Sequence, residues 1–149
     1  MTNASVLVRA ARKSRGLTQK DLAQRTNVDQ GRVSRFEGGR EAEFSIVERF
    51  LSGTGHRLYS APTRRDDAAT IASAIRGCLR AGDKYSALRE LILLSDNLRS
   101  EHGLVRRVLG LAEPEPTGDQ AWDAAFAALV DLRLSEAGLA PTRHRQVGA

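Results

Sequence analysis

Residues 16–40 read GLTQKDLAQRTNVDQGRVSRFEGGR, and this stretch decides the fold. Thr18 is suited to cap a helix that begins at the next residue, and Asp21, three positions later, completes a pattern typical of a capping box. After a short turn, Asp29 is suited to cap another helix over residues 30–37, which two glycines then stop. The stretch therefore predicts two short helices joined by a tight turn.

The flanking sequence predicts more helices. Apolar residues at helical spacing indicate one helix over residues 5–14, ended by Gly16, and another over residues 44–52. Residues 56–60, HRLYS, alternate in polarity, so they could form a short strand or an extended arm.

The helix expected over residues 30–37 has a polar outer face. This face carries Gln30, Arg32, Ser34 and Arg35. Arginine can donate two hydrogen bonds to guanine in the major groove, and glutamine can pair with adenine. At the start of the preceding helix, free backbone N–H groups and the Gln19 side chain could bind a phosphate. The pattern therefore predicts binding to double-stranded DNA.

This run resembles the xenobiotic-response-element class of helix-turn-helix, with the lambda-repressor-like fold of Cro and the phage repressors. The shared positions are Leu17, Thr18, Gln19, Leu22, Ala23, Val28, Val33, Ser34, Glu37 and Gly39, and the wider resemblance covers residues 6–59. It implies that Gln19 binds a phosphate and that Gln30, Arg32 and Arg35 face the bases. It also implies that Arg12 and Glu37 form a buried ion pair.

Two features depart from that family. Gly31 stands where many relatives carry a polar side chain, and glycine weakens a helix by up to about 1 kcal/mol. The run at residues 40–44 lacks the proline that usually precedes the next helix. Two further roles stay open: Ser34 could contact a base or pack locally, and Arg40 could contact a phosphate or be solvated only. The predicted DNA-binding set is Thr18, Gln19, Gln30, Arg32, Ser34, Arg35 and Arg40.

Charge is unevenly distributed along the 149 residues, whose net charge is +5. Residues 1–65 contain 13 Lys and Arg against 6 Asp and Glu, whereas residues 66–149 contain 10 against 12. This asymmetry indicates that the basic residues 1–65 bind a polyanionic partner. Basic residues at 57, 64 and 65 could contact phosphates, but we favour a basic linker.

The second half also reads as helical, so the predicted class is all-α. We expect a DNA-binding domain over residues 1–60, a linker over 61–67, a helical domain over 68–140 and a disordered tail over 141–149. Leu88, Leu91, Ile92 and Leu98 should form the inner stripe of one helix, widened by Leu94. The Glu-Pro run at residues 113–118 predicts a rigid linker that leaves the last helix, over residues 120–136, semi-detached.

No enzyme, metal or cofactor site is expected. The three histidines lack ligand spacing, and the second half has no nucleophile with a nearby base. Cys78 lies on an apolar stripe and should be a packed core residue, as should Trp122, although the Trp122 helix could instead dock on a partner. One cysteine and no signal-peptide pattern favour the cytoplasm.

The sequence therefore predicts a transcriptional regulator. We expect a repressor that reads a palindromic operator as a homodimer, with the second half closing the dimer. The alternative is an antitoxin that binds its own operator through the first half and a toxin through the C-terminal helices. That alternative rests on the order of the two halves and on the Ala-, Arg- and Leu-rich helices of the second half, and no specific motif supports it.

Overall fold

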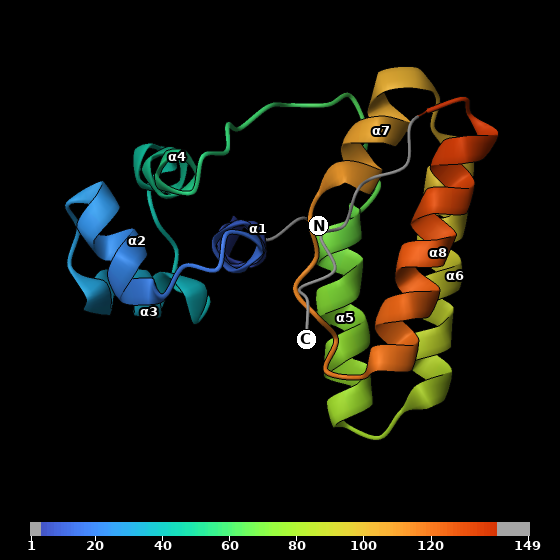
Figure 1. The fold of residues 1–149 in the computed structure, drawn as a ribbon, viewed down its shortest axis with the longest axis horizontal. Helices are drawn as coiled ribbons and strands as arrows, with labels where there is room; N and C mark the ends of the chain where they lie inside the picture. The colour runs from blue at the N-terminus through green and yellow to red at the C-terminus, as the bar shows by residue number, and fades with distance from the viewer. Residues whose placement is uncertain (1–3, 140–149) are drawn as a thin grey trace. The chain divides into compact units, whose positions relative to one another are not determined.

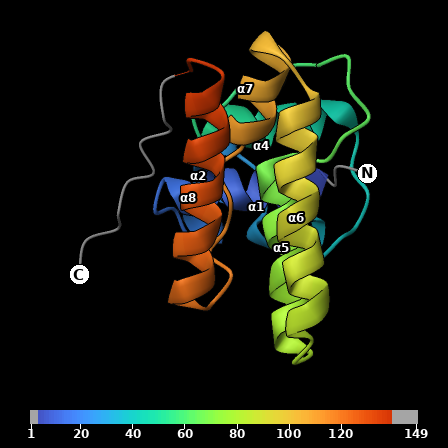
Figure 2. The ribbon, with the colours of Figure 1, turned by 90° about the vertical axis from the view of Figure 1, so that its right-hand side faces the viewer.

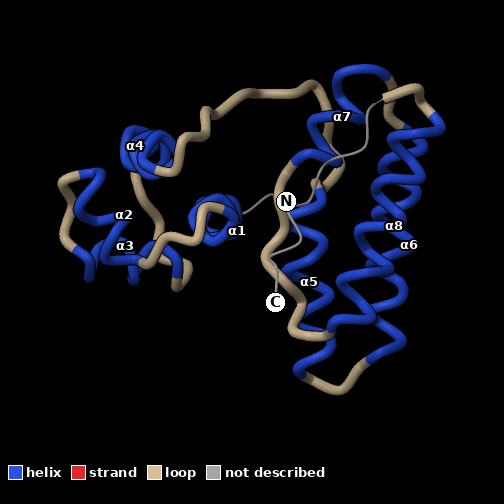
Figure 3. The backbone as a smooth tube through the Cα atoms, viewed as in Figure 1, coloured by secondary structure: helices blue, strands red, loops and turns tan. Residues whose placement is uncertain are grey.

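The computed structural model describes residues 4–139, and within that range it consists of helices and connecting segments with no strand (Figures 1 and 3). The chain divides between Ser60 and Ala61 into two compact units. The all-α class expected from the sequence is confirmed.

The N-terminal unit contains four helices around one small core. They are α1 (Ala4–Ser14), α2 (Gln19–Thr26), α3 (Gln30–Glu37) and α4 (Phe44–Gly53). Each helix turns an apolar face inward, and the core consists of Val8, Ala11, Leu22, Ala23, Val33, Phe36, Ile46, Val47, Phe50 and Leu51. The rings of Phe36 and Phe50, with centroids 5.4 Å apart, join α3 to α4.

Local sequence determines where α2 and α3 begin and how they are joined. The Thr18 hydroxyl accepts a hydrogen bond from the Asp21 N–H at 3.1 Å, and the Thr18 N–H donates to the Asp21 carboxylate at 2.8 Å. Asp29 accepts from the Arg32 N–H at 3.1 Å. Between them, Asn27 takes a left-handed conformation with φ of 52°, which asparagine tolerates better than most residues. The capping box and the tight turn are therefore both formed.

The strand considered for residues 56–60 is absent, and these residues form neither helix nor strand. The His56 N–H donates to the Leu51 carbonyl at 2.9 Å, so the segment starts as an extension of the end of α4. A single alternating segment cannot become a strand without a neighbouring strand to share its backbone hydrogen bonds. The described part of the chain offers no such neighbour.

The second unit is also helical. It contains α5 (Ala68–Arg80), α6 (Lys84–Ser100), α7 (Gly103–Leu111) and α8 (Gln120–Glu136). In Figures 1 and 2, α5, α6 and α8 run alongside one another, and the shorter α7 lies near one end. The buried residues at their centre include Ile71, Ile75, Leu94, Leu98, Leu109, Phe126, Val130 and Leu134. Half-buried Cys78 and Trp122 pack against this core, as expected.

The inner stripe expected for α6 is partly wrong. The buried residues are Ala87, Leu94, Asn97 and Leu98, whereas Leu88 and Ile92 are 48% and 52% exposed. Apolar residues occur on both faces of α6, so the spacing alone could not tell which face packs against α5 and α8. The packed face is shifted around the helix from the predicted one.

The segment before α8 is not a free hinge. Glu115 and Thr117 are buried, and Glu115 forms an ion pair with Arg76 of α5. The Thr117 N–H and hydroxyl both donate to Asp123, at 2.8 Å and 2.7 Å. The last helix is therefore held in the unit, and the expectation that it is semi-detached is wrong.

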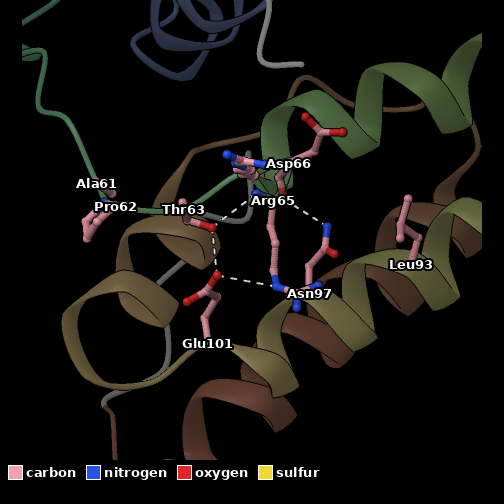
Figure 4. Close-up of a pocket in the computed structure, with 9 residues that line it drawn as sticks. Ala61, Pro62, Thr63, Arg65, Asp66, Leu93, Asn97 and Glu101 are labelled. Carbon is pink, nitrogen blue, oxygen red and sulfur yellow. Dashed lines mark hydrogen bonds and ion pairs between the residues drawn. The ribbon is translucent and has the colours of Figure 1, made fainter.

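Residues 61–67, expected as a linker, are bonded to the second unit (Figure 4). The Thr63 hydroxyl donates to Glu101 at 2.7 Å, and Arg65 Nε lies 3.3 Å from the same carboxylate. The buried Asn97 amide donates to the Asp66 carbonyl at 3.2 Å. These residues line an open hollow of about 770 Å³. The tail expected over residues 141–149 lies outside the described residues.

Candidate nucleic-acid interface

The DNA-contact residues expected from the sequence lie on α2, on α3 and just after α3. Gln30, Arg32, Ser34 and Arg35 are exposed on α3, and Arg40 is exposed three residues beyond it. Gln19 is half-buried at the first position of α2, after the exposed cap residue Thr18. Figure 1 labels these helices and shows α2 and α3 next to each other.

Helix α3 has one packed face and one open face. Val33, Phe36 and Glu37 are buried, while the remaining polar residues point away from the core. Within the described residues, Arg32 and Arg35 have no ion-pair partner and the Ser34 hydroxyl has no hydrogen-bond partner. The open face therefore presents unused donors, which is what base or phosphate contacts require.

A buried ion pair joins α1 to the end of α3. Arg12 Nε and Nη2 donate to the two carboxylate oxygens of Glu37 at 2.7 Å and 2.8 Å, and Arg12 Nη1 donates to the Leu17 carbonyl at 2.7 Å. The side chains are only 8% and 3% exposed. Two parallel hydrogen bonds in a buried setting fix the direction of α3 relative to α1.

Gln19 belongs to the same network. Its Nε2 donates to Glu37 at 3.0 Å, which orients the amide at the start of α2. The amide still has a second N–H and a carbonyl oxygen for an outside partner. This bond was not expected from the sequence, because residues 19 and 37 lie on different helices and no local pattern relates them.

Thr18 is occupied as a cap. Its hydroxyl donates to Asp21 at 2.7 Å and accepts from the Asp21 N–H. These hydrogen bonds from Thr18 hold the pKa of the Asp21 carboxyl below its ordinary value. The geometry gives Thr18 a role in starting α2, and any phosphate contact would be additional.

Arg35 reaches back over Gly31. A Cβ added at residue 31 would lie 3.1 Å from Arg35 Nη1 and 2.8 Å from Asp29 Oδ2. The space left by the missing side chain is therefore taken by a guanidinium from one turn later. The sequence alone suggested a gap in the contact surface at this position, whereas the structure fills it with a donor.

Two residues of the same surface were not singled out from the sequence. Lys20 and Gln24, exposed on α2, line a shallow hollow of about 500 Å³ together with Gln30. They are four residues apart and so share one helix face. Their four-residue spacing, on the side of α2 away from the buried Leu22, is the sequence signal that could have placed them on this surface.

The described residues contain no group of His, Cys, Asp and Glu that could hold a metal ion. None of the described helices is both long enough and apolar enough to cross a bilayer.

Comparison with known families found one similarity, and it lies in the N-terminal unit. Residues 5–56, about a third of the chain, match a family model described as a helix-turn-helix domain. The N-terminal unit is therefore similar to helix-turn-helix domains over nearly all of its described length. No curated protein and no solved structure matched the chain. Within the helix-turn-helix domain, α2 and α3 form the motif, and its second helix is the one that such domains place in the major groove.

Proposed function

We propose that this chain is a sequence-specific regulator of transcription that binds double-stranded DNA through α3. The observation that carries the proposal is the open face of α3, where Gln30, Arg32 and Arg35 are exposed on a helix whose other face is packed. The helix-turn-helix match over residues 5–56 supports the same assignment.

In the proposed complex, α3 lies in the major groove. Arg32 and Arg35 donate to guanine O6 and N7, and Gln30 pairs with adenine. Ser34, whose hydroxyl is unused, contacts a base edge beside them. The four side chains project from the exposed side of a helix held rigid by its packed side, so their spacing selects a short run of base pairs.

Phosphate contacts fix the register of that helix. Gln19, oriented by Glu37, binds a phosphate together with the free N–H groups at the start of α2. Arg40 binds a second phosphate, since its N–H donates to the Arg35 carbonyl at 3.0 Å and holds it beside the end of α3. Thr18 supports this site by capping α2.

One α3 reads too few base pairs to define an operator. We infer that two copies bind two half-sites about 34 Å apart on one face of the DNA. Bound across a promoter, such a dimer would block RNA polymerase, so repression in the cytoplasm is the expected outcome.

The test is selection of bound sequences from a random DNA pool. Arg35→Ala and Gln30→Ala should each cost about 1–3 kcal/mol at one base position and relax the preference there. Gln19→Ala should weaken binding to all sequences alike. Arg107→Ala, an exposed arginine on α7, is the matched control and should change nothing. An unchanged preference in both α3 variants would overturn the assignment.

The antitoxin alternative is favoured by apolar side chains that the second unit leaves in solvent. Leu104 on α7 is 75% exposed and Leu132 on α8 is 52% exposed. Exposed apolar surface marks protein-binding sites when it is extensive. Co-expression with the product of the neighbouring reading frame distinguishes the two functions. A stoichiometric complex that Leu104→Glu abolishes would favour the antitoxin, and purification with DNA alone would favour the plain regulator.

A further inference from the structure

The outer face of α6 carries an apolar stripe that its own unit does not cover. Tyr85, Leu88, Ile92 and Leu93 are 74%, 48%, 52% and 43% exposed. The opposite face of the helix, with Leu94 and Leu98, is fully buried. Helix α6 is therefore apolar on two sides, and only one side packs within its unit. Figure 2 shows α6 at the front of the four helices, beside α8.

Two opposite charges flank this stripe. Arg89 lies one turn before its centre and Asp96 one turn after it, and both are exposed. They are seven residues apart, about 10 Å along the helix at 1.5 Å per residue, which is too far for an ion pair within α6. Among the described residues, neither forms an ion pair with any other group.

A second copy of α6 would satisfy both charges. In an antiparallel pair of identical helices, facing residues have numbers that add to a constant. If the two-fold axis passes between Ile92 and Leu93, Arg89 faces Asp96 of the partner subunit, and Asp96 faces Arg89 of the partner subunit. At the centre, Ile92 faces Leu93 of the partner subunit, so apolar side chains meet where the charges do not.

We propose that α6 is the surface on which two copies of this chain associate, antiparallel and two-fold symmetric. The occupant is a second copy because the charge pattern is complementary to itself: a two-fold axis makes each ion pair occur twice. The central contacts of Ile92 and Leu93 supply the apolar part of the association, and the reciprocal charges set the register. The role of this dimer rests on the proposed function, since it would supply the two reading helices of an operator complex.

The association is tested on the full chain without DNA. Sedimentation equilibrium of the wild type should give twice the 16.2 kDa mass of one chain. Ile92→Glu should give the monomer mass, whereas Leu111→Glu, at a leucine of α7 that is 45% exposed against 52% for Ile92, should leave the dimer unchanged. Circular dichroism of each variant checks that it stays helical, so that a monomer mass is not the result of unfolding.

The charge pairs supply a second test that does not touch the apolar stripe. Arg89→Glu and Asp96→Arg should each raise the dimer dissociation constant at least tenfold, because each creates two like-charge contacts. The double variant Arg89→Glu/Asp96→Arg should return to within about threefold of the wild type, because both pairs form again with reversed sign.

Three results would overturn the proposal: a monomeric wild type at micromolar concentration, an Ile92→Glu dimer, or a double variant no tighter than the single ones. None of them bears on whether α3 binds DNA. Failure of the proposed function would instead appear as a dimer that shows no DNA preference, so the two failures are distinguishable.

Discussion

Arg12 and Glu37 form a two-point ion pair across 25 residues of chain, with Nε–Oε1 and Nη2–Oε2 distances of 2.7 Å and 2.8 Å. Arg12 lies near the end of α1, and Glu37 is the last residue of α3. Glu37 also accepts from Gln19 at the start of α2. One carboxylate therefore couples three helices of the N-terminal unit.

Removing one partner of this pair should be far more costly than removing both. Arg12→Met should lower the free energy of unfolding by about 3 kcal/mol, because it leaves a buried carboxylate without its charge partner. Arg12→Met/Glu37→Leu should lose less than the single variant, since no buried charge remains. Urea unfolding measures both. A double variant as unstable as the sum of the two single variants would contradict the argument.

Replacing Gly31 should change DNA preference more than stability. A Cβ there would approach Arg35 Nη1, a movable side-chain end, to 3.1 Å, and Asp29 Oδ2, the atom that caps α3, to 2.8 Å. Gly31→Ala should therefore keep the fold, because up to about 1 kcal/mol gained from helix propensity offsets the strain on the cap, while Arg35 is displaced. Sequence selection with the variant should show an altered base at the Arg35 position. Unaltered selection would show that Arg35 does not depend on the space at residue 31.

Gly53 and Gly77 should respond in opposite directions to alanine. A Cβ at Gly53 would lie 2.5 Å from Thr26 Cγ2 and 3.0 Å from Leu22 Cδ1, so Gly53→Ala should destabilise the unit by about 1–3 kcal/mol. Nothing lies within 4 Å of a Cβ at Gly77, inside α5, so Gly77→Ala should stabilise by about 0.4–1 kcal/mol. Thermal unfolding compares the two. A neutral Gly53→Ala would mean that α2 and α4 can separate freely.

Asp67 and Asp83 both cap helices, and they should have opposite pH dependences. Burial raises the pKa of Asp67 above 3.8, so its stabilising contribution is present below pH 3.8 and is lost as pH rises through the raised pKa. Hydrogen bonds from Ser86 lower the pKa of Asp83, so its contribution is present above pH 3.8 and is lost as pH falls through the lowered pKa.

Asparagine variants test this contrast. Asp67→Asn should gain stability relative to the wild type at neutral pH and lose that gain in acid. Asp83→Asn should be less stable than the wild type at neutral pH and equal to it in acid. Unfolding curves at several pH values give both differences, and parallel curves for the two variants would refute the assignment.

DNA binding should weaken steeply with salt. Each phosphate neutralised adds about −0.9 to the slope of log K against log salt concentration. Arg40→Ala should make the slope about one unit less steep if Arg40 binds a phosphate. Arg107→Ala in the second unit is the control, and its slope should equal that of the wild type. An unchanged slope for Arg40→Ala would leave Arg40 as a solvated residue.

Local sequence determined the helix-turn-helix in detail. The capping hydrogen bonds of Thr18, Asp21 and Asp29 join residues only three positions apart. The starts of α2 and α3 could therefore be predicted from the sequence. The outward direction of Gln30 and Arg35 followed from helical period as well, because α3 has only one apolar face. Features that depend only on residues a few positions away can be predicted from the sequence.

Tertiary structure decided the features that depend on distant neighbours. Residues 56–60 stay out of a strand because no partner strand is present among the described residues, and α6 packs through Leu94 and Leu98 because α5 and α8 lie on that side. The bond from Gln19 to Glu37 and the reach of Arg35 over Gly31 likewise need three-dimensional proximity. Hydrophobic spacing shows that a face is apolar, and only packing decides which apolar face is buried and which is left exposed.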